Sequence, residues 1–330
     1  MNKKRWLALL IAVVLFVVSI GFQVATSIAS ANFEQIFTFP ENKFPEELIE
    51  KGTNGKIVVL HLDGVIQDTA PSTLLNTTSY NHKQFLKMLD VAARDSSVDG
   101  IILRINTPGG GVVESAEVHD KIVDIQQEYK KPIYVSMGNT AASGGYYISA
   151  PADKIVAHPA TLTGSIGVIM EGYNLSELTD KLGIEVNTIK SGEHKDIMST
   201  FREMTDEERQ ILQTMIDDMY GDFVQVIVEG RGLSEEKVRE LGDGRVYTGS
   251  QAKENGLVDE LGSLDDTIDL MKNDLKLKNA QVVKYNSPLG FEKFFGMSMQ
   301  SFIGKDEELI NMLDIIRESN APRAMYLYSN

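Results

Sequence analysis

Short apolar runs and helical apolar periods alternate along the middle of this chain. Apolar runs bounded by turn residues predict buried strands, and apolar residues at every third or fourth position predict amphipathic helices. Strands that alternate with helices of this length are typical of βαβ units around a parallel sheet. The predicted strands span 56–66, 98–105 and 131–138, and the predicted helices span 80–94 and 112–129.

The pattern continues with shorter elements toward the C-terminus. A cap at Thr205 or Asp206, acidic residues in the first turn and a closing glycine predict the longest of these helices. Further short strands are predicted at 153–159, 164–170 and 184–192, and further helices at 174–183, 205–232, 234–241 and 250–255.

The N-terminus has the pattern of a membrane anchor. Residues 1–5 carry three positive charges, and residues 6–22 are almost wholly apolar with a milder stretch to 28. About 20 apolar residues suffice for a transmembrane helix, and flanking basic residues stay in the cytoplasm. We therefore expect a single-pass protein of the cell membrane whose catalytic domain is extracytoplasmic. A cleaved signal peptide is the alternative, because residues 29–31 resemble a cleavage site.

These patterns divide the chain into four parts. Residues 1–31 form the predicted cytoplasmic stub and transmembrane anchor, 32–55 a linker with one short helix, and 56–285 the folded domain. Residues 286–330 hold an apolar segment with four Phe and two Met, followed by a flexible tail. Such a segment is typical of core packing, or of an oligomer or membrane-facing surface.

Composition excludes several functions. The net charge of -15 excludes nucleic acid as a partner, because phosphate binding needs clustered Lys and Arg. No cysteine is present, which excludes thiol catalysis, disulfides and cysteine metal sites. Neither a phosphate-binding lysine loop nor a dinucleotide fingerprint occurs. We expect no metal and no organic cofactor.

Two glycine-rich turns follow successive predicted strands. TPGGG (107–111) and ASGGYY (142–147) both lead into predicted helices. Ligands bind outside the C-terminal ends of parallel strands, and helix N-termini present free N–H groups to anions. Ser143 lies in the second turn, where it could attack a carbonyl whose developing oxyanion meets those N–H groups. The alternative is an ordinary helix cap.

A serine nucleophile needs a base. His158, at a strand end before Pro159, is the best histidine candidate. A lysine is the alternative, because desolvation can lower a lysine pKa from about 10.4 toward 7–8. Composition alone does not choose that lysine.

Several motifs together resemble the signal peptide peptidase A family of membrane-anchored serine proteases, in its short, single-unit form. Their order and spacing match the family over about residues 56–270. The matching pieces are the N-terminal anchor, IILRINTPGGG (101–111), ASGGYYIS (142–149), TGSIGVIM (163–170), SGEHKD (191–196) and FREMTDEER (201–209).

The resemblance implies a crotonase/ClpP-like fold with a Ser/Lys dyad in domain 56–285. Ser143 matches the nucleophile and Lys195 the general base; Gly110 and Gly144 match the oxyanion hole. Ser165 matches a residue that helps to hold the lysine. Members of the family degrade remnant signal peptides and similar small or apolar peptides, and assemble as ring- or dome-shaped homo-oligomers.

Three further interpretations stay open. Lys195 stands between His194 and Asp196 in a polar run, where a solvated surface lysine is common. A catalytically silent peptide-binding scaffold on the same fold is the rival function, and a crotonase-type acyl-CoA enzyme is a weaker one. The small, terminal residues 321–325 could also enter an active site as a self-substrate.

Overall fold

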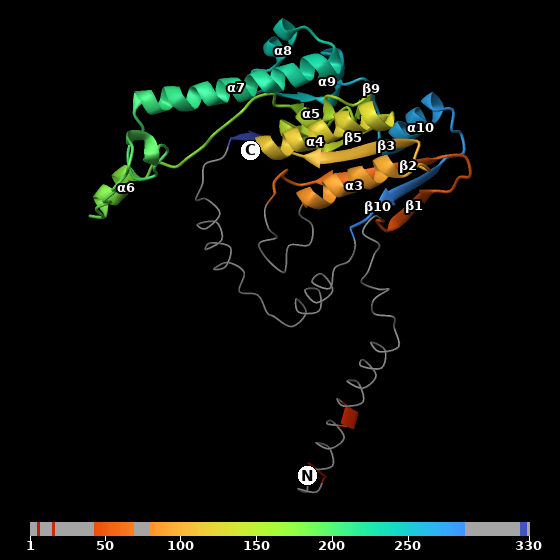
Figure 1. Ribbon diagram of the computed structural model, residues 1–330, viewed down its shortest axis with the longest axis horizontal. Coiled ribbons are helices and arrows are strands. Elements are labelled where there is room, and N and C mark those ends of the chain that lie inside the picture. Colours follow the sequence, from red (N-terminus) through yellow and green to blue (C-terminus); the bar gives the residue numbers. More distant parts are fainter. Residues whose placement is uncertain (1–4, 7–14, 17–42, 69–79, 288–323, 329–330) are drawn as a thin grey trace.

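The computed structural model describes residues 5–6, 15–16, 43–68, 80–287 and 324–328, and it contains a nine-stranded, mostly parallel sheet (Figure 1). The strand order is β1-β10-β2-β3-β5-β6-β9, with β7 beside β5 and β8 beside β7; only β1–β10 and β7–β8 are antiparallel. The predicted α/β class with a parallel sheet is therefore confirmed. The strands are β1 (Glu46–Glu50), β2 (Lys56–Asp63), β3 (Gly100–Thr107), β5 (Ile133–Ala142), β6 (Lys154–Ala157), β7 (Leu162–Gly164), β8 (Val246–Thr248), β9 (Glu260–Leu261) and β10 (Gln281–Tyr285).

Helices cover both faces of this sheet. One face packs against α3, α4, α5 and the C-terminal half of α7, and the other packs against α10. A π-helical turn, Ile125–Tyr129, extends α4. The helices are α3 (His82–Arg94), α4 (Val112–Asp124), α5 (Gly144–Ser149), α6 (Ser176–Lys181), α7 (Asp206–Arg231), α8 (Glu235–Leu241), α9 (Gly249–Glu254) and α10 (Leu264–Asp274).

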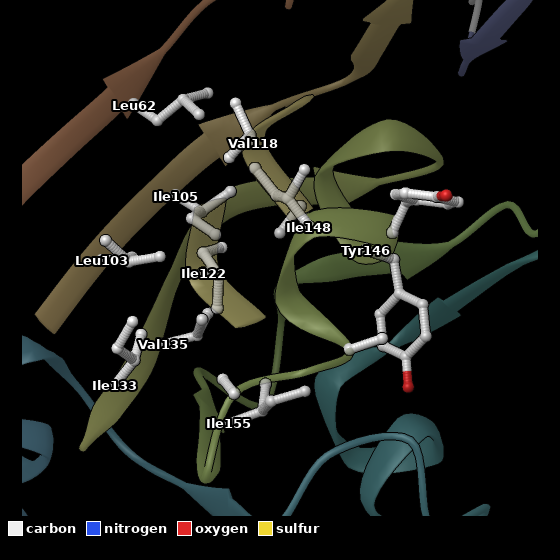
Figure 2. Packing of buried hydrophobic residues seen from close by; sticks show 14 of the residues in the cluster. Leu62, Leu103, Ile105, Val118, Ile122, Ile133, Val135, Tyr146, Ile148 and Ile155 are labelled. Carbon is white, nitrogen blue, oxygen red and sulfur yellow. The ribbon is translucent and has the colours of Figure 1, made fainter. Parts of the chain in front are cut away.

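The apolar runs of the central strands follow from burial on both faces. In β2, Leu60 and Leu62 point into the large core, whereas Ile57 packs toward α10. Figure 2 shows the large core around Leu103 and Ile122, where side chains of α4 and α5 interdigitate with those of β3 and β5. This packing fixes the strand ends from which the glycine turns leave.

Two predicted strands are wrong. β7 ends at Gly164, so 164–170 is not a strand, and 184–192 has no strand either. Residues 171–204, which we call the arm, carry mostly exposed side chains and extend away from the sheet together with the N-terminal end of α7 (Figure 1). The alternating residues 184–192 therefore meet no neighbouring strand with which to pair.

Several strands occur where none was predicted, among them β1, β10 and β11, and the short strands β4, β8 and β9. β1 lies inside the expected linker and pairs with β10, which was also not predicted. In the expected flexible tail, β11 (Met325–Leu327) pairs with β4 (Gly109–Gly111). Fraying is thus wrong for these three tail residues, because the backbone bonds and the burial of Tyr326 hold them.

The predicted anchor and the aromatic segment at 287–304 lie almost entirely outside the described residues. Within the described ranges, no helix is long and apolar enough to cross a membrane.

Candidate active site

Ser143 lies at the sharp turn between β5 and α5. Its backbone angles, φ 52° and ψ -117°, belong to a region that residues other than glycine seldom adopt. Its N–H donates to Gly164 O at 2.7 Å, and its carbonyl accepts from the N–H groups of Tyr146 and Tyr147. A strained strand-to-helix turn of this kind presents the nucleophile of α/β-hydrolases.

The hydroxyl of Ser143 is not used as a helix cap. Ser143 occupies the N-cap position of α5, yet its side chain makes no capping hydrogen bond. Thr205 and Ser234, by contrast, cap α7 and α8 through their side chains. The alternative interpretation of Ser143 as an ordinary cap is therefore wrong, and its oxygen remains available for chemistry.

The two glycine turns meet beside Ser143. A Cβ atom added to Gly109 would lie 2.7 Å from Gly144 N, and one added to Gly144 would lie 3.2 Å from Gly110 N. Gly109 also has φ +108°, which L side chains rarely adopt. The contacts thus bring the backbones of Gly110 and Gly144 together, as the sequence predicted.

Ser115 is a buried residue of this site that the sequence analysis missed. A Cβ on Gly144 would lie 2.6 Å from Ser115 Oγ, so the hydroxyl keeps position 144 a glycine. Ser115 is fully buried, and its oxygen has no hydrogen-bond partner among the described residues. Ser115 stands on the first turn of α4, just after the glycines, and this position in the sequence could have identified it as a candidate site residue.

The C-terminal strand β11 lies across the glycine turn as an extended peptide. Tyr326 pairs with Gly110, and Tyr328 N–H donates to Pro108 O at 2.8 Å. On the other edge, Met325 exchanges two backbone bonds with Ile169, at 2.9 and 3.0 Å. The tail therefore fills a two-sided peptide groove. The Tyr326 carbonyl lies against both glycine turns, since Cβ atoms on Gly109 and Gly144 would be 2.0 and 3.2 Å from it.

An aromatic pocket holds the Tyr326 side chain. Its ring stacks on Tyr147 with centroids 4.9 Å apart and lies 4.7 Å from that of Phe223. Its hydroxyl donates to Met219 O at 2.9 Å, which satisfies the polar end of a residue only 1% exposed. Burial raises the pKa of the Tyr147 phenol to about 12. The pocket is thus chemically suited to a large, mostly apolar side chain.

Ser165 directly follows β7, the strand that pairs with the end of β5 before Ser143. Ala142 of β5 is paired with Gly164 of β7. Ser143 follows Ala142 and Ser165 follows Gly164, so the two serines come directly after paired residues. Ser165 is nearly buried, has φ 49°, and its N–H donates to Arg245 O. The structure thus brings together Ser143, Gly110, Gly144 and Ser165.

Lys195 lies elsewhere in the chain. It belongs to the 3-10 turn η2 (Glu193–Asp196) of the arm, beside the N-terminus of α7, and it is exposed. The rise of α7 from Glu208 to Phe223, where the helix enters the core, is about 22 Å at about 1.5 Å per residue. A lysine side chain does not span that length, so one chain alone does not bring Lys195 to Ser143.

The His158 side chain hydrogen-bonds to the backbone of its own turn. It is exposed after β6, and its Nδ1 accepts from Ala160 N–H at 3.1 Å. No contact joins it to Ser143 within the described residues. The geometry gives His158 no place as the base.

Sequence comparisons with known proteins find peptidases among the relatives of this chain. The profile of peptidase family S49 matches residues 125–278. A candidate signal peptide peptidase SppA of Enterococcus faecium is 40% identical over 99% of both chains. The chloroplastic serine protease SPPA of Arabidopsis thaliana is 28% identical over 80% of this chain and 39% of that protein. Among solved structures, a mutant of the 1510-N membrane-bound stomatin-specific protease covers 71% of this chain and 99% of its own, at 17% identity and a TM-score of 0.47.

Proposed function

This chain belongs to peptidase family S49, and from that premise we propose that it is a membrane-anchored serine endopeptidase with a Ser/Lys dyad. The observation that carries the proposal is the strained turn at Ser143, packed against two glycine turns and an occupied peptide groove. Each part has a role in acyl transfer: a nucleophile, backbone oxyanion donors and a strand that aligns a peptide.

The chemistry follows from these positions. Ser143 Oγ bonds to the scissile carbonyl carbon while its proton passes to the neutral amine of Lys195. N–H groups of Gly110 and Gly144 stabilise the oxyanion, roughly 2.7–4 kcal/mol for each donor. Lys195 returns the proton to the leaving nitrogen as the C–N bond breaks. Water then repeats the sequence on the acyl-enzyme and frees Ser143, while Ser165 helps to hold the lysine.

A second copy of the chain supplies the lysine in this proposal. The arm that carries Lys195 exposes large apolar side chains: Tyr173, Leu178, Leu182, Ile184, Val186 and Ile189 are 46–102% exposed. Such a surface is typical of a segment that packs on a partner. A homo-oligomer, in a ring or dome, would cover these residues and deliver Lys195 to the Ser143 of a neighbouring copy.

The substrates we propose are remnant signal peptides and similar small or apolar peptides. Support comes from β11, whose extended backbone pairs with β4 and whose Tyr326 side chain fills the aromatic pocket. The expected N-terminal anchor would keep the extracytoplasmic domain close to peptides leaving the membrane.

Covalent labelling tests this function against the rival peptide-binding scaffold. Wild type should react with a serine-directed phosphonate at Ser143 and cleave an apolar peptide, whereas Ser143→Ala and Lys195→Ala should be folded and inactive. Ser136→Ala, at another buried serine remote from the turn, controls for the loss of a hydroxyl. A wild-type protein that binds the peptide but is neither labelled nor active would favour the scaffold.

A further inference from the structure

An arginine fixes the turn that carries Lys195. Arg202 Nε and Nη2 donate to the two carboxylate oxygens of Asp196, at 3.0 and 2.7 Å. Nη2 also donates to the Asp196 carbonyl at 3.0 Å. A planar guanidinium that bonds a carboxylate in this way fixes direction as well as distance. The residue that follows Lys195 is therefore held in one orientation.

The same guanidinium connects the turn to α7. Arg202 Nη1 and Nη2 donate to the carboxylate of Glu208, at 2.8 and 2.5 Å. Glu208 is only 2% exposed, and it forms a capping box with Thr205 at the start of α7. The turn is thus bonded to the end of a 26-residue helix whose other half lies in the core.

Other charged groups around the turn complete its support. Lys190 Nζ donates to Asp196 Oδ1 and to the Glu193 carbonyl, both at 2.7 Å. His194 Nε2 lies 3.8 Å from Glu207 Oε1, and Nδ1 lies 3.9 Å from Glu208 Oε1. Asp196, which follows Lys195, is thus held by hydrogen bonds, whereas the His194 side chain lies near two carboxylates and makes no hydrogen bond among the described residues.

In the part of the chain that the structure describes, Lys195 itself is left without a partner. It is exposed, and no hydrogen bond or ion pair to its amine occurs among the described residues. Both carboxylate oxygens of Asp196 already bond Arg202 or Lys190, so the adjacent acid is not directed at the amine.

We propose that Arg202 is a positioning residue: by clamping Asp196 to Glu208, it aims the Lys195 amine and occupies the carboxylate that would otherwise pair with it. This inference rests on the proposed function, in which Lys195 is the general base. Misplacement of a catalytic group by about 1 Å can cost about 100-fold in rate, which sets the size of the expected effect.

The test compares kcat, KM and pH dependence on an apolar peptide for assembled wild type and variants. Arg202→Ala should lower kcat about 100-fold with KM nearly unchanged. It should also move the midpoint of the pH–kcat profile upward, because the freed Asp196 carboxylate pairs with the amine. Adding Asp196→Asn should return the midpoint toward wild type while kcat stays low. Arg202→Lys should rescue kcat only in part, because a lysine ammonium group lacks the planar set of donors with which a guanidinium bonds both oxygens of a carboxylate.

Controls separate this inference from the function on which it rests. Arg239→Ala removes a more exposed arginine–carboxylate pair, with Glu235 on α8, and should leave both kcat and the midpoint unchanged. If Lys195→Ala keeps wild-type activity, the proposed function fails. If Lys195→Ala is inactive while Arg202→Ala keeps kcat or the wild-type midpoint, the function stands and the positioning role is overturned. Should Arg202→Ala not assemble, Arg202→Lys gives the same readouts with smaller changes.

Discussion

The backbone of Tyr326 pairs with that of Gly110, which places the end of the chain across the glycine turn next to Ser143. Strand addition to an exposed edge is a common way to bind an extended peptide, with backbone bonds for affinity and side-chain pockets for selectivity. β11 uses both, through its ladder with β4 and the aromatic pocket around Tyr326. If the proposed function holds, the tail therefore occupies the path of a substrate.

We expect the tail to be a substrate of the protein itself. Intact-mass spectrometry should find wild type shortened at the C-terminus and Ser143→Ala at full length. Tyr326→Ala should slow the shortening because it removes the side chain that fills the pocket, whereas Tyr328→Ala, outside that pocket, should not. Equal C-terminal masses in wild type and Ser143→Ala would rule out self-processing.

Gly144→Ala should abolish most activity. The added methyl group would meet Ser115 Oγ at 2.6 Å and displace the N–H that faces the oxyanion, a loss of about 100- to 1000-fold in kcat. Gly221→Ala, on the α7 surface with no atom within 4 Å of the new Cβ, is the matched control and should remain active. Steady-state kinetics measures this loss of kcat. If Gly144→Ala kept the wild-type kcat, the Gly144 N–H would have no role in the mechanism.

Ser143→Gly should stabilise the protein while it removes activity. The positive φ of Ser143 costs about 1 kcal/mol or more, and glycine relieves this strain. Denaturant unfolding should show a free energy of unfolding higher by about 1 kcal/mol for Ser143→Gly. Ser143→Ala, which keeps a Cβ, should show no such gain. An equal gain in both variants would mean that the hydroxyl, and not the backbone, carries the strain.

The clamp around Arg202 should survive mild acid. Hydrogen bonds from Arg202 lower the pKa of Asp196 well below its usual range and that of Glu208 to about 2. A carboxylate with a lowered folded pKa adds stability above its unfolded pKa, about 3.9 for Asp and 4.3 for Glu, and loses it as the pH falls further. The difference in thermal midpoint between wild type and Arg202→Ala should therefore be constant from pH 8 to 5 and shrink below about pH 4. A difference that already shrinks between pH 8 and 6 would contradict this assignment.

Much of the central fold follows from the sequence because it is local. The apolar run of β2 reflects a strand that is buried on both faces. The helical apolar period of α3 reflects a helix that is buried on one face. The run 164–170 has the same apolar character, but beyond Gly164 it meets another strand only at the single bridge between Ile169 and Met325. The run 184–192 forms no strand pairing among the described residues. Strand pairing depends on distant residues, which is also why β1, β10 and β11 were missed.

The residues of the candidate site likewise fall into those that the sequence could identify and those that it could not. Ser143 and the two glycine-rich turns could be found because adjacent βα turns must end on one edge of the sheet. Gly110 and Gly144 as the oxyanion donors came from the family resemblance. Lys195 came only from the family resemblance, since nothing near it in sequence points to Ser143. Tyr326 and Ser115 were missed because their roles arise from contacts with Gly110 and Gly144 that no local pattern records.

Subunit mixing tests the central claim, that Ser143 of one copy works with Lys195 of another. Ser143→Ala and Lys195→Ala, each inactive alone, should be co-expressed with different tags, purified as mixed assemblies and assayed on an apolar peptide. In a symmetric assembly about a quarter of the sites then pair an intact Ser143 with an intact Lys195, so about a quarter of wild-type activity should return. Mixed assemblies with no activity would contradict a dyad shared between copies.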